Sequence, residues 1–402
     1  MVNLIKYELK KHFLKRSIVI ALLIFSVINI VKIDSIHREN SLIGETMPPS
    51  WNDTYWQLYD DFGGQMTLDK IDALMAIQRP LEQQTADLTA STAMDNPDTY
   101  TGNVYSDYYL LTWCFVQPME YAYMYRYTAN DIVRAAQDNM QFYSEHSNEY
   151  LYRENEAIAK LFTGRSISDF AYTEMYQYYL EYDFSALLVI LICLYGLIGV
   201  FVSEKEADMD TLILTTLSGG QKTVMAKIIA SAIFIMIVCM WFWVLDFAAF
   251  SFSFGSLEAA SLPLYALQNF EYASVNLTLS QFSLLSAGIK TMGMLVIGMI
   301  VLLISSKSKN ALFPFAMSLV LCGGIILAQE MVAGSGNVLM TALNPFALVA
   351  NSELFKKVEF INIFGTPILS YAAAVLFAAV TGIAITVSLI TSARKSTITA
   401  RK

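Results

Sequence analysis

Six long apolar runs dominate the pattern of hydrophobic and polar positions along the chain. Each run approaches the roughly 20 residues that a helix needs to cross about 30 Å of hydrocarbon. Hydrophobic residues make up 55% of the 402 residues and charged residues only 15%, which is too little charge to cover a water-soluble surface of this size. The pattern therefore predicts an all-α membrane protein with six transmembrane helices, at about 17–33, 184–202, 228–250, 283–304, 311–329 and 368–391.

The first run follows a basic segment, so it needs to be distinguished from a secretory signal. Residues 1–16 place Val2, Ile5, Leu9 and Phe13 on one helical stripe flanked by lysines, which is typical of an amphipathic helix in the membrane interface. The residues after Ile33 contain no small-residue cleavage pattern. We therefore expect an interfacial helix over 1–16 that continues into an uncleaved first transmembrane helix over 17–33, with five further transmembrane helices within 184–402.

A long polar segment, residues 34–183, separates the first two runs. It contains 24 acidic and 8 basic side chains, a net charge of −16, together with 18 of the 23 tyrosines. Apolar residues recur at helical spacing near residues 71–83 and 155–162. The segment predicts a mostly helical domain, whose acidity either attracts cationic ligands or, the interpretation we favour, provides solubility.

The distribution of lysine and arginine predicts the orientation of the spans. Fourteen basic residues lie in the short segments on one side of the membrane, whereas the short segments on the other side, about 251–282 and 330–367, hold only Lys356 and Lys357. Short loops rich in lysine and arginine stay in the cytoplasm. Both termini are therefore expected to be cytoplasmic and residues 34–183 extracytoplasmic. The fourteen are Lys6, Lys10, Lys11, Lys15, Arg16, Lys205, Lys222, Lys227, Lys307, Lys309, Arg394, Lys395, Arg401 and Lys402.

The cytoplasmic segment 203–227 contains Leu-Ser-Gly-Gly-Gln at 217–221, the letters with which ATP-binding cassette ATPases contact nucleotide. The chain has no G-x-x-x-x-G-K-[ST] loop to hold phosphates, and about 25 residues cannot form a nucleotide-binding domain. We interpret the five letters as coincidence. No Ser-His-Asp, Cys-His or metal-ligand pattern accompanies the three histidines and four cysteines, so a membrane-anchored enzyme is disfavoured.

The same segment resembles the first cytoplasmic loop of ABC-2 type transporter permeases. That family has an E-[RK]-E stretch, a leucine-containing helix, a turn and a basic residue that begins the next span. Here Glu204-Lys205-Glu206 precedes Leu212, Ile213 and Leu214, and Lys227 begins the third run. Asp208 replaces a glycine that is usual in the family, and Gly220 replaces a basic residue. The amphipathic start and six spans extend the resemblance to about 250 residues, but not to 34–183.

The resemblance implies that the segment 203–227 docks on a separate ATPase subunit, which binds the ATP and magnesium, while this chain binds no cofactor and no nucleic acid. Leu212, Ile213 and Leu214 offer an apolar ridge for such docking, with Glu204, Glu206, Asp208 and Asp210 as a charged rim. A second permease, the same chain or a different one, completes the transporter. The expected function is export or extraction of an amphipathic compound, peptide or lipid across a bacterial plasma membrane; the alternative is a non-transporting relay that drives an external sensing or resistance domain.

Two further features lie in or near the spans. The apolar segment 333–366 is broken by glycine and proline and holds Asn344-Pro345-Phe346, which the resemblance interprets as two short re-entrant helices at the outer face. Asp246 and Lys290 are charged residues inside the third and fourth runs, at similar predicted depth. Because intramembrane charges are usually paired, we expect an ion pair between them, with snorkelling of Lys290 and substrate contact as alternatives.

Overall fold

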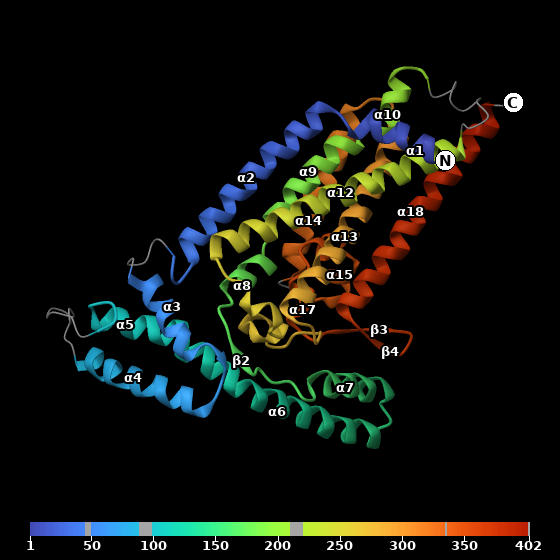
Figure 1. Ribbon diagram of the computed structural model, residues 1–402. Coiled ribbons are helices and arrows are strands. Elements are labelled where there is room, and N and C mark those ends of the chain that lie inside the picture. The colour runs from blue at the N-terminus through green and yellow to red at the C-terminus, as the bar shows by residue number, and fades with distance from the viewer. Residues whose placement is uncertain (45–49, 88–98, 210–219, 334–335, 401–402) are drawn as a thin grey trace. The chain divides into compact units, whose positions relative to one another are not determined.

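A computed structural model describes residues 1–44, 50–87, 99–209, 220–333 and 336–400. The described chain is mostly helical, and six of its helices are long and apolar enough to cross a membrane (Figure 1). This confirms the six predicted runs and indicates a multi-pass membrane protein. The chain divides into two compact units, which we name the membrane unit (1–31, 179–249 and 282–402) and the tyrosine-rich unit (32–178 and 250–281).

The membrane unit contains the greater part of each span. Its shorter helices before the third span are α1 (Val2–Glu8), the π-helix η1 (Leu9–Phe13), α9 (Phe184–Leu197) and α10 (Gly199–Glu206). The long helices are α2 (Arg16–Asn40), α12 (Gln221–Phe254), α13 (Leu279–Lys307), α14 (Leu312–Ala333) and α18 (Ser370–Ala400). The short elements are α15 (Val338–Leu343), α16 (Pro345–Val349), α17 (Glu353–Lys356), β3 (Phe360–Ile363) and β4 (Thr366–Leu369).

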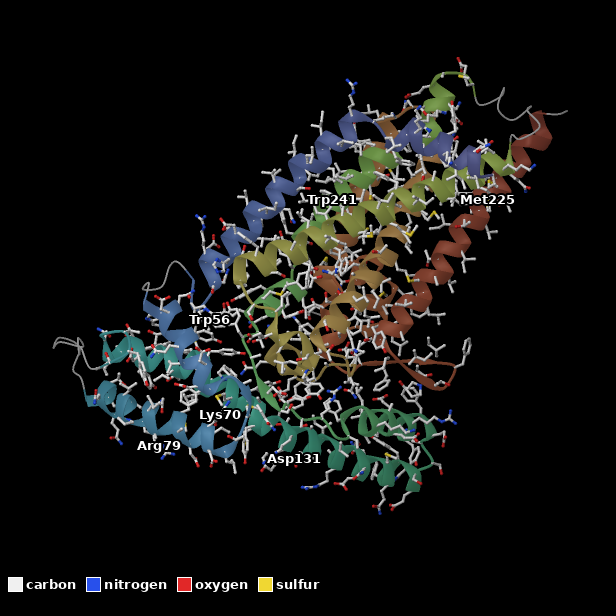
Figure 2. All side chains as sticks on the ribbon, viewed as in Figure 1. Trp56, Lys70, Arg79, Asp131, Met225 and Trp241 are labelled. Carbon is white, nitrogen blue, oxygen red and sulfur yellow. The ribbon has the colours of Figure 1, made fainter. Side chains whose placement is uncertain are left out.

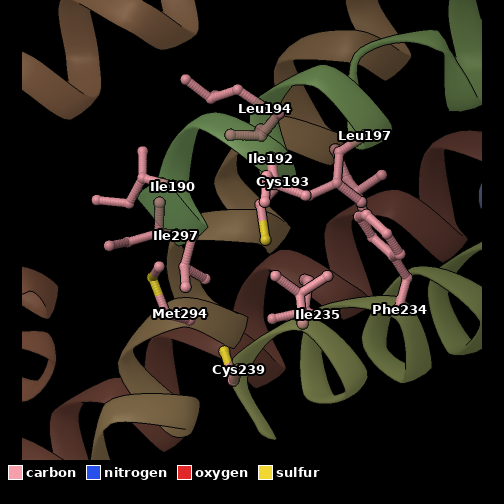
Figure 3. Packing of buried hydrophobic residues seen from close by; sticks show 14 of the residues in the cluster. Ile190, Ile192, Cys193, Leu194, Leu197, Phe234, Ile235, Cys239, Met294 and Ile297 are labelled. Carbon is pink, nitrogen blue, oxygen red and sulfur yellow. The ribbon is translucent and has the colours of Figure 1, made fainter. Parts of the chain in front are cut away.

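The second span, with α9 and α10, lies at the centre of this unit. The chain itself buries 72% of its apolar window, but only 22% of the windows in α2, α14 and α18. Figure 3 shows side chains of α9, among them Cys193 and Leu197, packed against Phe234 and Ile235 of α12 and against Ile297 of α13. The three outlying helices therefore leave apolar faces to be covered by lipid or by another chain.

Trp241 on α12, labelled in Figure 2, is 44% exposed, and its indole Nε1 donates to Ser26 Oγ of α2 at 2.9 Å. Ser26 itself is buried. A hydrogen bond between two apolar helices gives them a fixed relative rotation, because an unpaired polar group has no alternative partner in hydrocarbon. The first span is therefore fastened to the third by a polar contact as well as by packing.

The segment after α14 forms short helices, as predicted, but also a β-hairpin that was not predicted. Strands β3 and β4 are antiparallel and paired from Phe360 with Leu369 to Ile363 with Thr366. Phe364 and Gly365 between them have φ of 51° and 82°, the two positive values that a type I′ turn requires. The last helix therefore begins at Ser370, two residues after the predicted start of the sixth run.

Gly293 allows α13 to approach α16 closely. A Cβ at this position would lie 2.9 Å from the carbonyl oxygen of Pro345 and 2.8 Å from Val349 Cγ2. We expect Gly293→Ala to destabilise the protein by about 1–3 kcal/mol because backbone must shift to relieve the clash. The matched control is Gly288→Ala on the same helix, where the added Cβ meets nothing within 4 Å. Thermal unfolding in detergent should show a lower midpoint for the first variant alone; equal midpoints would contradict the packing.

The tyrosine-rich unit consists mainly of helices. It contains α3 (Ser50–Phe62), α4 (Leu68–Asp87), α5 (Val104–Leu111), the π-helix η2 (Thr112–Val116), α6 (Gln117–Glu145), α7 (Glu149–Phe162) and most of the short helix α8 (Glu174–Leu180). A two-residue pairing joins β1 (Gly64–Gln65) to β2 (Asp169–Phe170), and three 3₁₀ turns follow later in the chain, η3 (Glu258–Ser261), η4 (Leu264–Ala266) and η5 (Gln268–Phe270). The predicted helical character is confirmed for the described residues of segment 34–183.

Buried Arg165 joins the two parts of the chain that form this unit. Its guanidinium donates to Asn276 Oδ1 at 2.8 Å and to the carbonyl oxygen of Ala273 at 2.7 Å, and it lies 4.0 Å from the centre of the Phe162 ring. Because arginine keeps its charge when buried, it needs several acceptors at once. Segment 250–281 is thus held in the same compact unit as 32–178.

Candidate functional site

The predicted docking segment is described only at its two ends. Asp210, Leu212, Ile213 and Leu214 lie outside the described residues, so the apolar ridge and the contribution of Asp210 to the rim stay predictions. Glu204, Glu206 and Asp208 precede the gap and Lys227 follows it. Glu206 and Asp208 are exposed, as a charged rim would be, whereas Glu204 and Lys227 are buried.

Lys227 is the clearest correction to the sequence analysis. It is only 1% exposed, and its Nζ lies 3.0 Å from Glu8 Oε2, 2.8 Å from Glu204 Oε1 and 2.9 Å from the carbonyl oxygen of Val200. An ammonium has three protons, and these three acceptors use all of them. Lys227 therefore fastens the N-terminal helix and the second span to the beginning of the third, and it is not available to a partner.

Two more residues of the N-terminal helix complete this group, which we name the N-terminal charge cluster: Glu8, Lys11, His12, Glu204 and Lys227. Lys11 Nζ donates to Glu204 Oε1 at 2.6 Å, and His12 Nε2 lies 3.3 Å from Glu8 Oε2 without hydrogen-bond geometry. Burial lowers the pKa of His12, which keeps its ring neutral. Burial alone would raise the pKa of Glu8, but the neighbouring His12 and Lys227 outweigh it and the pKa is lowered.

The cluster contains side chains that could bind a metal ion, but the ammonium of Lys227 lies between their carboxylates. Ligand atoms of Glu8, His12 and Glu204 lie within 4.8 Å of one another. However, the ammonium of Lys227 already contacts both carboxylates, at the place a divalent ion would take. The cluster is better understood as a structural fastening than as a metal centre.

We expect the cluster to make stability depend on pH through His12. The unfolded chain binds a proton on His12 below its ordinary pKa of 6.5, whereas the folded protein resists protonation because its pKa is lowered. The contribution of His12 to the free energy of unfolding is therefore fully present above pH 6.5 and is lost as the pH falls below 6.5. Glu8, whose pKa is lowered, adds a further loss when the pH falls below 4.5.

Thermal midpoints measured from pH 5 to pH 8 should show this slope. His12→Gln should flatten it between pH 5 and pH 6.5, and the exposed His146 provides the matched control as His146→Gln. If His12→Gln left the slope unchanged, the assignment of the neutral buried ring would be wrong.

The residues next to Glu204 are tied to other helix ends as well. Lys205 Nζ donates to the carbonyl oxygens of Ser306 and Ser308 at the end of α13, and Glu206 Oε1 accepts from the backbone N–H of Ala311 at 2.8 Å. A cation at a helix C-terminus and a carboxylate on backbone N–H groups near a helix start are both favourable. Asp208 has φ of 51°, in the left-handed region that favours glycine, which accounts for a turn directly after α10.

The predicted ion pair between Asp246 and Lys290 is wrong. Asp246 Oδ1 accepts from Asn29 Nδ2 at 2.5 Å and its Oδ2 accepts from Ser185 Oγ at 2.6 Å. Lys290 Nζ instead lies 3.1 Å from Asp183 Oδ1 and donates to the carbonyl oxygen of Tyr182 at 3.0 Å. Lys290 therefore pairs with Asp183, directly before α9, and Asp246 is hydrogen-bonded by two neutral donors instead.

Both charges nevertheless line one cavity of about 60 Å³ between the spans. Its wall also contains Tyr182, Ser185 and Ser286. The volume is enough for one or more ordered waters among these polar groups. Asn29 and Ser185 were missed by the sequence analysis, although each is a lone polar side chain inside or beside an apolar run, and such residues usually face the interior of a bundle.

Asn344, Pro345 and Phe346 lie where the spans cover them. Asn344 Nδ2 donates to the carbonyl oxygen of Ile325 in α14 at 2.9 Å, while its Oδ1 caps α16 by accepting from the N–H of Phe346 at 3.0 Å. Beyond α16, Asn351 exchanges two hydrogen bonds with Ser286 of α13. The short helices are thus held by α13 and α14, as broken helices covered by protein require.

No protein family, curated protein or solved structure matched this chain.

Proposed function

We propose that this chain is the membrane subunit of an ATP-binding cassette transporter of the ABC-2 type, moved by a separate ATPase subunit that binds the ATP and magnesium. The observation that carries the proposal is the set of contacts around the docking segment 203–227. Glu204 and Lys227, at its two ends, belong to one buried charge cluster, and Lys205 holds the end of α13. A force applied to this segment reaches several helices at once.

Buried ion contacts suit such a transmission. A charge that leaves its partners in a low-dielectric interior loses several kcal/mol, so the linked elements move together and do not slide past one another. The cluster joins α1, α10 and α12 through Glu8, Glu204 and Lys227. Displacement of the docking segment would therefore tilt the N-terminal helix and the second and third spans as one body.

The proposed topology places both termini in the cytoplasm of a bacterial cell and residues 34–183 outside its plasma membrane. Its support is that segments 32–178 and 250–281, both assigned to the outer side from their charges, belong to one compact unit. The weakly buried faces of α2, α14 and α18 suit contact with lipid or with a second permease.

The second candidate is a relay that uses the same drive without transport. The cavity between the spans, about 60 Å³, is far smaller than the roughly 300–1,000 Å³ of typical ligand sites. A transporter of amphipathic compounds, peptides or lipids needs a wider path, which two permease copies would have to form between them. A sealed assembly of two copies would favour the relay.

The test is purification from the native membrane in mild detergent, followed by identification of the bound proteins and reconstitution. We expect an ATPase with a phosphate-binding G-x-x-x-x-G-K-[ST] loop, whose ATP hydrolysis rises when this chain is added. The proposal would be contradicted if no ATPase co-purified with the chain, or if adding the chain did not change the rate of ATP hydrolysis by the ATPase that did.

A further inference from the structure

The tyrosine-rich unit contains a second cavity, which the proposed function does not use. Its volume is about 290 Å³, nearly five times that of the cavity between the spans. It lies where η2 and the beginning of α6 face residues 167–177 and the turns η4 and η5. A volume of this size is at the lower end of the range of small-molecule sites.

A buried carboxylate, Glu174, forms part of the wall of this cavity. It is 9% exposed and accepts hydrogen bonds from Ser41 Oγ at 2.8 Å, from the N–H of Leu42 at 3.1 Å and from the hydroxyl of Tyr172 at 2.9 Å. All three donors are neutral, and no ion pair within the described part of the chain includes Glu174. Buried carboxylates are usually paired with a cation, so this one lacks its expected counter-charge.

Aromatic rings make up much of the remaining wall: Tyr55, Trp113, Tyr121, Phe170 and Tyr172. Ring faces attract cations through their quadrupole, most strongly organic ammonium ions that lose little hydration on entering. A bare metal ion would need several oxygen ligands instead. Glu174 and the exposed Asp169 are the two carboxylates of the wall, and a buried carboxylate such as Glu174 among aromatic rings favours an organic cation.

We propose that this cavity binds a small organic ammonium ion, with Glu174 as its counter-charge and the aromatic rings as its cage. Trp113 lines the cavity and is half exposed, so part of the wall is in contact with solvent. The net charge of −16 over residues 34–183 raises the local concentration of cations. Binding of an ammonium ion at this site does not depend on whether an ATPase moves the spans.

The experiment is calorimetric titration of the full-length protein, in maltoside detergent and without any partner, with choline and with its neutral isostere 3,3-dimethylbutanol. We expect saturable binding of choline and at least roughly tenfold weaker binding of the isostere, because the two differ only in charge. Glu174→Gln, which keeps hydrogen-bonding capacity, should weaken choline binding by a similar factor. No saturable choline binding, or equal binding of the two probes, overturns the proposal.

A second pair of variants serves if Glu174→Gln does not fold. Trp113→Ala removes a cage ring that is already half exposed, and Tyr105→Ala removes an exposed ring of α5 that does not line the cavity. We expect only the first to weaken choline binding, and unchanged affinity would overturn the proposal. Competition by glycerophosphocholine would identify a lipid headgroup as the source of the ammonium; its failure beside intact choline binding would identify a free solute.

Discussion

Lys227→Met is expected to destabilise the protein by about 3–5 kcal/mol, the largest effect of any single substitution considered. The variant leaves two carboxylates, Glu8 and Glu204, buried without the ammonium that lies 3.0 Å and 2.8 Å from them. Of the two carboxylates, Lys11 forms an ion pair with Glu204, so among the described contacts no lysine is left beside Glu8. The loss comes mainly from the uncompensated charges and only slightly from the missing hydrogen bonds.

The measurement is thermal unfolding in detergent, with Lys222→Met as the control, since Lys222 lies on the same helix and is exposed. The control should unfold at the wild-type temperature. Adding Glu8→Gln and Glu204→Gln to Lys227→Met should recover part of the loss, because neutral groups need no counter-charge. If Lys227→Met and Lys222→Met behaved alike, the cluster would not be the fastening described above.

Replacing both Leu212 and Leu214 by Asp is expected to weaken the ATPase complex by roughly a hundredfold or more, enough to lose it during purification. Hot-spot residues near the centre of an interface contribute about 2 kcal/mol or more each, and a carboxylate buried at such a position would oppose binding further. The spans should still fold, since the substitutions lie outside the apolar runs that form the spanning helices. Co-purification with the ATPase is the measurement.

The control for this pair adds the same charge elsewhere in the segment. Ser218→Asp with Gln221→Asp places two carboxylates outside the apolar ridge and also alters the Leu-Ser-Gly-Gly-Gln letters. We expect the ATPase to remain bound, because we interpret those letters as coincidence. If the control lost the ATPase and the leucine variant kept it, the apolar ridge would not be the docking surface. The Leu-Ser-Gly-Gly-Gln letters would then not be a coincidence.

Several elements could be predicted because their signals are local. A membrane span depends on one uninterrupted apolar run, and all six runs correspond to spanning-length helices. The helical spacing near residues 71–83 and 155–162 corresponds to α4 and α7. The β3–β4 hairpin was missed because its turn uses Phe364 and Gly365, and an exposed phenylalanine at positive φ is not a usual turn residue.

The sequence alone determined the class of this protein: apolar runs long enough to cross a bilayer, a tyrosine-rich acidic segment between the first two, and a polar segment before the third. Only the tertiary structure decided the partners of the charges. Asn29 and Asp246 are 217 residues apart, and Lys227 and Glu8 are 219 residues apart. A run of apolar residues specifies burial locally, but the partner of a buried charge depends on which distant helix packs beside it.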